Sequence, residues 1–182
     1  MYNHFLEVKK KYDDFYRKMM KDGLLPMRST AKGFWGASIS HEVYAAFEKL
    51  KLEKSRQFLD LGSGDGSVVM IASLFGPKSA GVEFDEWLIE VSRKMQRQLS
   101  HLPKVPAATF HHGDYFEHSL QGYDTIFINP DVPFFRGVES KLLKEMTGRL
   151  IVYGHDFLPQ HLEEEQHFVI NGTRIGVYRA PK

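Results

Sequence analysis

The sequence predicts an α/β fold: a mostly parallel open sheet with helices on both faces, ending in a C-terminal antiparallel hairpin. An apolar strand at residues 58–61 enters a glycine-rich turn and is followed at once by an apolar helix at residues 67–75. Strand and helix patterns then alternate along the chain, which is typical of a parallel sheet with helical crossovers. Asn171-Gly172 separates two runs of β-forming residues, the signature of a hairpin with a type I′ turn.

The chain has the length of a single domain. Residues 1–55 are expected to form N-terminal helices and a lid loop, and residues 56–182 the sheet core. Residues 1–22 carry apolar side chains at steps of three and four, the spacing of an amphipathic helix. Basic side chains line its other side. They indicate either the solvated face of a helix packed on the core or a docking surface for an acidic partner.

A second helix is expected after a segment rich in small residues, residues 24–40, which is predicted to be a loop. Phe34 and Trp35 in this loop are either core aromatics or part of a lid over a bound ligand. Ser40 can cap the following helix through its hydroxyl group. The buried stripe of that helix is formed by Val43, Ala46, Phe47 and Leu50.

Short apolar runs predict the remaining parallel strands, at residues 79–83, 107–112, 124–128 and 149–153. The spacing of acidic and apolar residues predicts helices that begin at Asp85 and at Glu139. The acidic run Glu163–Glu165 is expected to be a solvated segment. It precedes the two hairpin strands, at residues 168–170 and 173–178.

The glycine turn, Gly62-Ser63-Gly64-Asp65-Gly66, predicts a ligand site beyond the carboxyl end of the first core strand. Backbone amides of the following helix face that crevice, and glycines leave no side chain between backbone and ligand. The pattern is not the dinucleotide fingerprint, because its third glycine comes one residue early. Asp60 and Asp65 would also repel a pyrophosphate. They suit ammonium, sulfonium or ribose hydroxyl groups, and S-adenosylmethionine carries all three.

In this stretch the chain resembles the class I S-adenosylmethionine-dependent methyltransferases, whose first motif is an acidic residue followed by G-x-G-x-G. The resemblance implies a Rossmann-like seven-strand sheet and S-adenosylmethionine as the cofactor. The candidate cofactor-binding residues are Asp60, Gly62, Ser63, Gly64, Asp65, Gly66, Glu83, Phe84, Asp114, Tyr115 and Asn129.

Two further acids support the resemblance, each at the end of a predicted strand. Glu83 follows the glycine turn by about 20 positions, the place of the acid that holds the ribose hydroxyls in nucleotide-binding sheets. Asp114 ends the third strand, where an acid of the methyltransferase family accepts a hydrogen bond from the adenine amino group. Taken singly, Asp60, Glu83 and Asp114 could be ordinary turn or surface residues. Their shared position at three successive strand ends favours a cofactor site.

The fourth strand runs into Asn129-Pro130-Asp131, and its carboxyl end is expected beside the first strand, where the cofactor methyl points. Many amino-group methyltransferases carry N-P-P-aromatic here, and the Asn oxygen and a proline carbonyl receive the substrate NH. Asn129, Pro130 and Asp131 are therefore the candidate catalytic residues for methyl transfer by in-line displacement, although Asp131 replaces the second proline. Further candidates near the acceptor are two polar groups and two apolar walls: Tyr153, His155, Phe134 and Phe135.

A second resemblance concerns the methyl acceptor. Trp35-Gly36-Ala37-Ser38, the glycine turn, Gly81-Val82-Glu83 and Trp87-Leu88 look like the corresponding parts of the small archaeal and mitochondrial protein-lysine methyltransferases. A lysine amine of a protein is therefore the first hypothesis for the acceptor. The alternatives are RNA or another nucleobase, a small molecule, and a role as an S-adenosylmethionine-binding partner protein without catalysis. The oligomeric state stays open.

The composition excludes several other functions. The 182 residues include no cysteine, which rules out disulfides, thiol catalysis and cysteine-ligated zinc. A net charge of +1 argues neither for nor against nucleic acid. His41-Glu42 begins the zinc motif H-E-x-x-H, but Ala45 stands where the second histidine belongs, so no metal site is expected. With no signal peptide and no apolar stretch long enough to insert into a membrane, a cytoplasmic location is expected.

Overall fold

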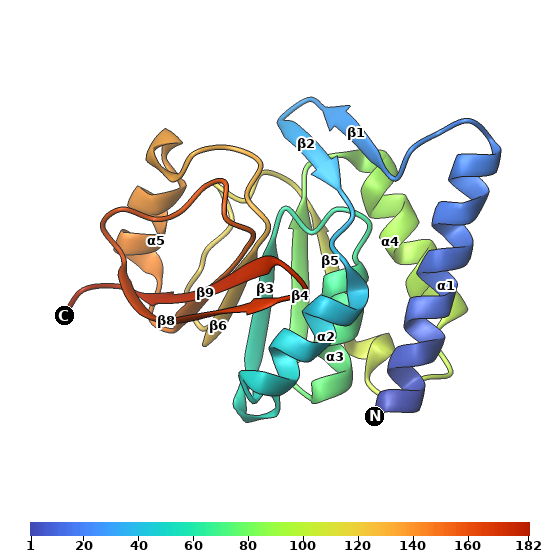
Figure 1. Cartoon of the computed structure of the whole chain (residues 1–182), viewed down its shortest axis with the longest axis horizontal. Helices are drawn as coiled ribbons and strands as arrows, with labels where there is room; N and C mark the ends of the chain where they lie inside the picture. Colours follow the sequence, from blue (N-terminus) through green and yellow to red (C-terminus); the bar gives the residue numbers. More distant parts are fainter.

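The computed structural model describes residues 1–182, and its main feature is a seven-stranded sheet (Figure 1). Its strands are β3 (Gln57–Leu61), β4 (Lys78–Glu83), β5 (Thr109–His112), β6 (Thr125–Ile128), β7 (Arg149–Tyr153), β8 (Glu163–Ile170) and β9 (Thr173–Arg179). They lie in the order β5-β4-β3-β6-β7-β9-β8. β9 runs antiparallel to β7 and β8, and the other neighbours are parallel. The Rossmann-like seven-strand sheet with its C-terminal antiparallel hairpin is thus confirmed.

The strand order reverses at β3, which lies between β4 and β6. Asp60 is in register with Gly81 of β4 and with Phe127 of β6. Since these three strands are parallel, their carboxyl ends meet at one edge of the sheet. An edge of this kind, at a reversal of strand order, is where open α/β sheets bind their ligands.

Five helices flank the sheet, which separates the core into two layers. They are α1 (Tyr2–Lys21), α2 (Ser40–Lys49), α3 (Ser67–Phe75), α4 (Glu86–Gln98) and α5 (Val138–Glu145), with short 3₁₀ turns at Leu52–Lys54, Val105–Ala107 and Phe134–Arg136. Helix α1 packs on α2 and α3 rather than on the strands. Because side chains alternate along a strand, Phe58 packs in the larger core with α1–α4, whereas Leu59 packs in the smaller core with α5. No helix combines the length and the apolar character needed to cross a membrane.

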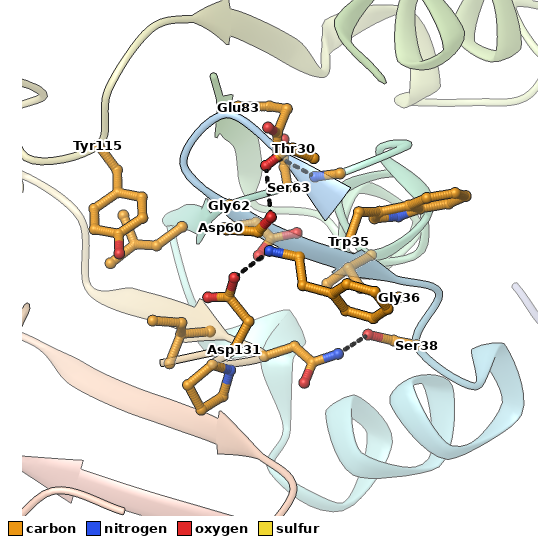
Figure 2. Close-up of a pocket in the computed structure, with 18 of the residues that line it drawn as sticks. Thr30, Trp35, Gly36, Ser38, Asp60, Gly62, Ser63, Glu83, Tyr115 and Asp131 are labelled. Atoms are coloured by element: carbon orange, nitrogen blue, oxygen red, sulfur yellow. Dashed lines mark hydrogen bonds between the residues drawn. The ribbon is translucent and has the colours of Figure 1, made fainter. Parts of the chain in front are cut away.

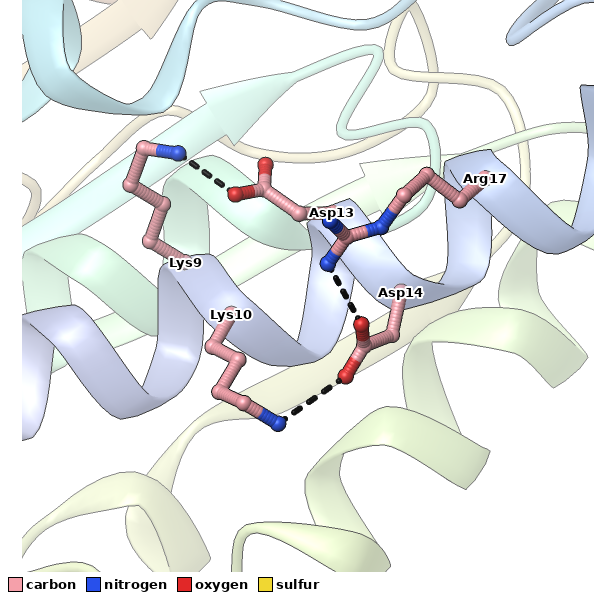
Figure 3. A network of polar contacts seen from close by, with 5 residues as sticks. All are labelled: Lys9, Lys10, Asp13, Asp14 and Arg17. Atoms are coloured by element: carbon pink, nitrogen blue, oxygen red, sulfur yellow. Dashed lines mark hydrogen bonds and ion pairs between the residues drawn. The ribbon is translucent and has the colours of Figure 1, made fainter.

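Helix α1 confirms the predicted amphipathic pattern. Its buried residues are Phe5, Val8, Tyr12 and Met19. On the opposite face, Lys9 bonds to Asp13, while Lys10 and Arg17 both bond to Asp14 (Figure 3). The face therefore carries both signs of charge, and exposed ion pairs of this kind contribute little to stability. This pairing favours a solvated face over a basic docking surface.

The prediction of a loop over residues 24–40 is wrong in part, because the chain there forms a separate hairpin. Its strands are β1 (Met27–Thr30) and β2 (Gly33–Gly36). Four-residue strands without alternating polarity have no recognisable strand pattern, which is why the sequence did not indicate them. The predicted cap is also wrong: Ile39 is the N-cap of α2, and Ser40 is its first helical residue with no capping bond from the side chain.

The acidic run Glu163–Glu165 is exposed, as expected, but it is the start of strand β8 rather than an irregular segment. β8 is one of the two edge strands, and charged side chains on an edge discourage pairing with another chain. Arg179 of β9 forms an ion pair with Glu163. The hairpin turn has the positive φ angles of a type I′ turn, 49° at Asn171 and 91° at Gly172, which confirms that prediction.

Candidate cofactor pocket and active site

A cavity of about 500 Å³ lies at the edge where the strands end. Residues of the β1–β2 hairpin, among them Thr30, Trp35 and Gly36, line it (Figure 2), and Figure 1 shows this hairpin above the ends of the central strands. Of the predicted cofactor residues, Gly66 alone does not line this cavity. The predicted residues that line it are Asp60, Gly62, Ser63, Gly64, Asp65, Glu83, Phe84, Asp114, Tyr115, Asn129, Pro130 and Asp131. The structure therefore brings together both the cofactor and the acceptor candidates.

The glycine turn packs tightly against Trp35 of the hairpin. Gly64 has φ of 53°, and a Cβ built there would lie 2.5 Å from Cδ1 of Trp35. Only glycine lets the indole pack so closely on the turn. Gly66 is the N-cap of α3, and a Cβ on it would lie 2.8 Å from Oγ of Ser92, so its glycine serves packing rather than the cavity. Ser63 lines the cavity, and its Oγ is buried beside Gly81 of β4 without a hydrogen-bond partner in the protein.

Glu83 joins the end of β4 to the glycine turn. Its Oε2 accepts the Gly64 amide at 2.9 Å, and its Oε1 accepts the Asp85 amide at 2.8 Å. The residue is only 8% exposed. A carboxylate has about four acceptor positions, so two remain after these bonds. Glu83 is therefore both fixed in orientation and able to accept two hydroxyl groups.

Two more buried carboxylates lie close to Glu83. Asp60 is 3% exposed and Asp65 2% exposed. Burial, and then the charges of Glu83 and Asp65, raises the pKa of Asp60 well above its ordinary value. Burial also raises the pKa of Asp65, although hydrogen bonds from Tyr16 and Ser67 oppose the shift. A ligand with positive charge would offset this concentration of buried negative charge, so the residues present fit the ammonium and sulfonium of S-adenosylmethionine.

The hairpin is attached to both sides of the cavity. At its tip, Lys32 Nζ lies 2.7 Å from Asp114 Oδ2 and 5.0 Å from the ring centroid of Phe84. Although burial opposes the shift, the bond from Lys32 lowers the pKa of Asp114. On the other side, the Phe34 amide donates to the Asp131 carboxylate (Figure 2). Lys32 is the only basic residue lining the cavity, and the sequence analysis missed it.

The two aromatics of the hairpin have different positions. Trp35 is 7% exposed and packs in a small cluster with Met19 and Leu88. Phe34 is 50% exposed and lines the cavity. Of the two interpretations, Trp35 is thus a core aromatic that also contacts the glycine turn, and Phe34 belongs to the lid.

At the acceptor end, four of the further candidates lie outside the cavity lining. Phe134 is buried in the smaller core and Phe135 is exposed, so the prediction that either forms the apolar wall is wrong. The hydroxyl of Tyr153 donates to Glu42 at 2.6 Å, which holds it away from the site. His155 is exposed and does not line the cavity either. At this end the cavity is also lined by Ile128, Asp156 and Phe157, which were not among the predicted site residues.

Asn129 is oriented by the segment that follows the hairpin. Its Nδ2 donates to Oγ of Ser38 at 3.1 Å. This bond and the bond from Phe34 to Asp131 connect residues 33–38 to the loop after β6. The hairpin and the acceptor loop therefore form one continuous rim around the cavity.

Solved structures share this fold at low sequence identity. An RNA methyltransferase from Salinibacter ruber, in complex with S-adenosyl-L-homocysteine, has a TM-score of 0.69 at 19% identity, covering 80% of this chain and 94% of that one. Magnesium protoporphyrin IX methyltransferase from Synechocystis, with bound S-adenosylmethionine, has a TM-score of 0.63 at 15% identity, covering 77% of each chain. The CcbJ methyltransferase from Streptomyces caelestis has a TM-score of 0.58 at 14% identity, covering 77% and 89%. A search of curated proteins finds no match.

A comparison with protein families identifies residues 22–146 as matching the family "Histone methylation protein DOT1". The match covers more than half of the chain and includes the hairpin, the glycine turn, Glu83, Asp114 and Asn129. The fold, the acidic cavity at the strand ends and this match agree with one another. The chain is an S-adenosylmethionine-dependent methyltransferase of the class I fold, and it belongs to the DOT1 family.

Proposed function

We propose that the methyl acceptor is a lysine side chain of a protein. The observation that carries the proposal is the composition of the acceptor end of the cavity, where Asp131 and Asp156 accompany the apolar Ile128 and Phe157. A lysine has a cationic head on an apolar stem, and this lining complements both parts. The family match supports the same choice, since its name refers to methylation of histones, which are proteins.

We further propose how the chain holds its cofactor. Glu83 has two free acceptor positions for the ribose hydroxyls. Asp60 and Asp65 supply the negative charge that binds the amino-acid end. The adenine is proposed to lie against Phe84, Asp114 and Tyr115. The amino-acid part is proposed to lie against the glycine turn, at Gly62, Ser63 and Gly64. When bound, S-adenosylmethionine supplies an electrophilic methyl group on its sulfonium.

On the acceptor side, Asn129 and Asp131 have separate proposed roles. Because Asn129 Nδ2 donates to Ser38, its Oδ1 is left to accept a hydrogen bond from the incoming amine. Asp131 attracts the ammonium at the entrance. Further in, the apolar side chains of Ile128 and Phe157 disfavour the charged form and so lower the pKa of the amine. With its pKa lowered, the amine can release its proton to water before the methyl transfer, so no strong general base is needed.

RNA is the second candidate acceptor, because the Salinibacter ruber protein with a similar fold is an RNA methyltransferase. The cavity lining argues against it. Its carboxylates would repel phosphate groups, and its only lysine is paired with Asp114. A protein acceptor fits this distribution of charge better.

The acceptor class can be tested directly. The protein is incubated with cell extract and S-adenosylmethionine carrying a labelled methyl group, and the products are divided between protease and nuclease treatment. We expect protease to release the label and mass spectrometry of the peptides to place it on lysine. Label that is released by nuclease alone would contradict the proposal and favour RNA.

A pair of variants makes the test specific to the acceptor end. Asp131→Asn should lower kcat/KM for the labelled protein about tenfold or more, the effect of losing one bond between charged groups. It should leave the affinity for S-adenosylhomocysteine almost unchanged. Asp13→Asn, on the outer face of α1, is the matched control and should change neither quantity. Equal kcat/KM values for Asp131→Asn and the wild type would remove Asp131 from the acceptor site.

A further inference from the structure

Helix α1 ends at Lys21, just before the residues that match the family begin. Two tyrosines on this helix nevertheless reach the glycine turn. The hydroxyl of Tyr12 donates to the backbone oxygen of Asp65 at 2.9 Å, and the hydroxyl of Tyr16 donates to Asp65 Oδ2 at 2.5 Å. Asp65 of the turn therefore accepts two hydrogen bonds from side chains that lie outside the matched residues 22–146.

The Asp65 carboxylate needs such partners. It is almost fully buried and lines the cavity, and its other oxygen, Oδ1, accepts the amide of Ser67 at 3.0 Å. Asp60 on β3 and Glu83 on β4 are carboxylates in the same cavity wall, so nearby charge does not favour ionisation of Asp65. Tyr16 donates to Oδ2 of Asp65, and the hydrogen bonds of Ser67 also favour the ionised form. Without the Tyr16 hydroxyl, a buried anion would lose a short hydrogen bond from a side chain.

We propose that Tyr16 is a positioning residue for cofactor binding: its hydroxyl orients the Asp65 carboxylate toward the cavity and keeps it ionised, so that α1 tunes the affinity for a cationic cofactor. The proposal rests on the proposed contact between Asp65 and the amino-acid end of the cofactor. Tyr12 has a different task, because its acceptor is a backbone carbonyl, which does not titrate. Tyr12 holds the backbone of the turn in place, whereas Tyr16 keeps the carboxylate of Asp65 negatively charged.

The groups that face Asp65 determine how binding depends on pH. They are Tyr12 and Tyr16 from α1, Asp60 from β3 and Glu83 from β4. Burial raises the pKa of both tyrosines, so they stay protonated and neutral at neutral pH. Burial raises the pKa of Asp65, whereas the hydrogen bond from Tyr16 lowers it. Removing the Tyr16 hydroxyl should therefore move the loss of affinity to a higher pH.

The test is calorimetric titration of S-adenosylhomocysteine, whose amino group is cationic, into the full-length wild type and into Tyr16→Phe, Tyr12→Phe, Asp65→Asn and the Tyr16→Phe/Asp65→Asn double variant. We expect Tyr16→Phe to weaken binding about tenfold near neutral pH, equivalent to about 1.4 kcal/mol. As the pH is lowered, the affinity of Tyr16→Phe should also begin to fall at a higher pH than the affinity of the wild type does. Tyr12→Phe should lower the melting temperature of the free protein but keep the wild-type pH profile.

The double variant separates this proposal from the cofactor contact on which it rests. If Tyr16 acts through Asp65, Tyr16→Phe should cause no further loss of affinity in a protein that already carries Asp65→Asn. If Asp65→Asn weakens binding while Tyr16→Phe has the affinity and pH profile of the wild type, the positioning role is wrong and the contact of Asp65 stands. If both single variants bind as the wild type does, the contact fails as well. Equal losses from Tyr16→Phe in both backgrounds would show that Tyr16 acts through packing, which also overturns the proposal.

Discussion

The ammonium of Lys32, at the tip of the β1–β2 hairpin, lies 2.7 Å from the carboxylate of Asp114 at the other side of the cavity. The same ammonium lies 5.0 Å from the ring centroid of Phe84. Asp114 and Phe84 are two of the residues proposed to surround the adenine. If the adenine binds there as proposed, it would compete with Lys32 for these two groups, and binding of the cofactor would change the contacts of Lys32.

Replacing Lys32 with methionine should tighten the binding of S-adenosylhomocysteine by a small factor. The variant removes a charge that occupies Asp114, while the ammonium of Lys32 is about half exposed, which keeps the pair weak. The gain should shrink as salt is added, because salt screens the pair in the wild type. Calorimetry at two ionic strengths measures both effects. Weaker binding by Lys32→Met would show instead that the lysine helps to retain the cofactor.

Replacing Glu83 with alanine should weaken cofactor binding by about 1–3 kcal/mol, the cost of leaving buried donors without a partner. The Gly64 and Asp85 amides lose their acceptor together with the proposed ribose contact. Glu83→Gln keeps one acceptor oxygen and should lose less. Affinities for S-adenosylhomocysteine from calorimetry give this ranking. An unchanged affinity for Glu83→Ala would refute the ribose assignment.

The stability of the free protein should fall as the pH rises above the ordinary carboxyl range of about 4. In the folded state the pKa values of Asp60 and Asp65 are raised above those of the unfolded chain. For such acids the folded state binds more protons than the unfolded state, so stability is lost as the pH rises through the raised pKa. Thermal unfolding at several pH values measures this slope.

Asp60→Asn tests the source of the slope. We expect a higher melting temperature than that of the wild type near neutral pH, because a buried charge with a raised pKa is removed. Stabilisation by S-adenosylhomocysteine should decrease at the same time. A variant with the wild-type slope and the wild-type response to the ligand would show that the pKa of Asp60 is not raised in the folded protein and that Asp60 does not contribute to ligand binding.

Gly64→Ala should weaken cofactor binding through a steric conflict. The added Cβ would lie 2.5 Å from Cδ1 of Trp35, and φ at this position is 53°. The smaller side chain of Trp35→Leu should relieve part of that conflict, so the two substitutions should lose less together than the sum of their separate losses. The affinities of the two single variants and of the double variant for S-adenosylhomocysteine show whether the losses are additive. Strictly additive losses would show that the backbone angle alone requires glycine.

The fold and the central site could be predicted because they depend on local patterns. The strand before the glycine turn, the helix after it and the acids at the ends of the next strands each have a signature within a few residues. Parallel strands bring their carboxyl ends to the same edge, so Asp60, Glu83 and Asp114 meet in one cavity without further information. The hairpin at Asn171-Gly172 was equally local.

Contacts between distant parts of the chain were decided only by the tertiary structure. Lys32 and Asp114 are 82 positions apart, and Tyr16 and Asp65 are 49 apart. No periodicity or motif relates such residues, since their meeting depends on how the hairpin and α1 pack on the folded core. The sequence alone determined that an acidic, side-chain-free turn would face a ligand. The packing of α1 and of the hairpin determined which side chains hold that turn and cover it.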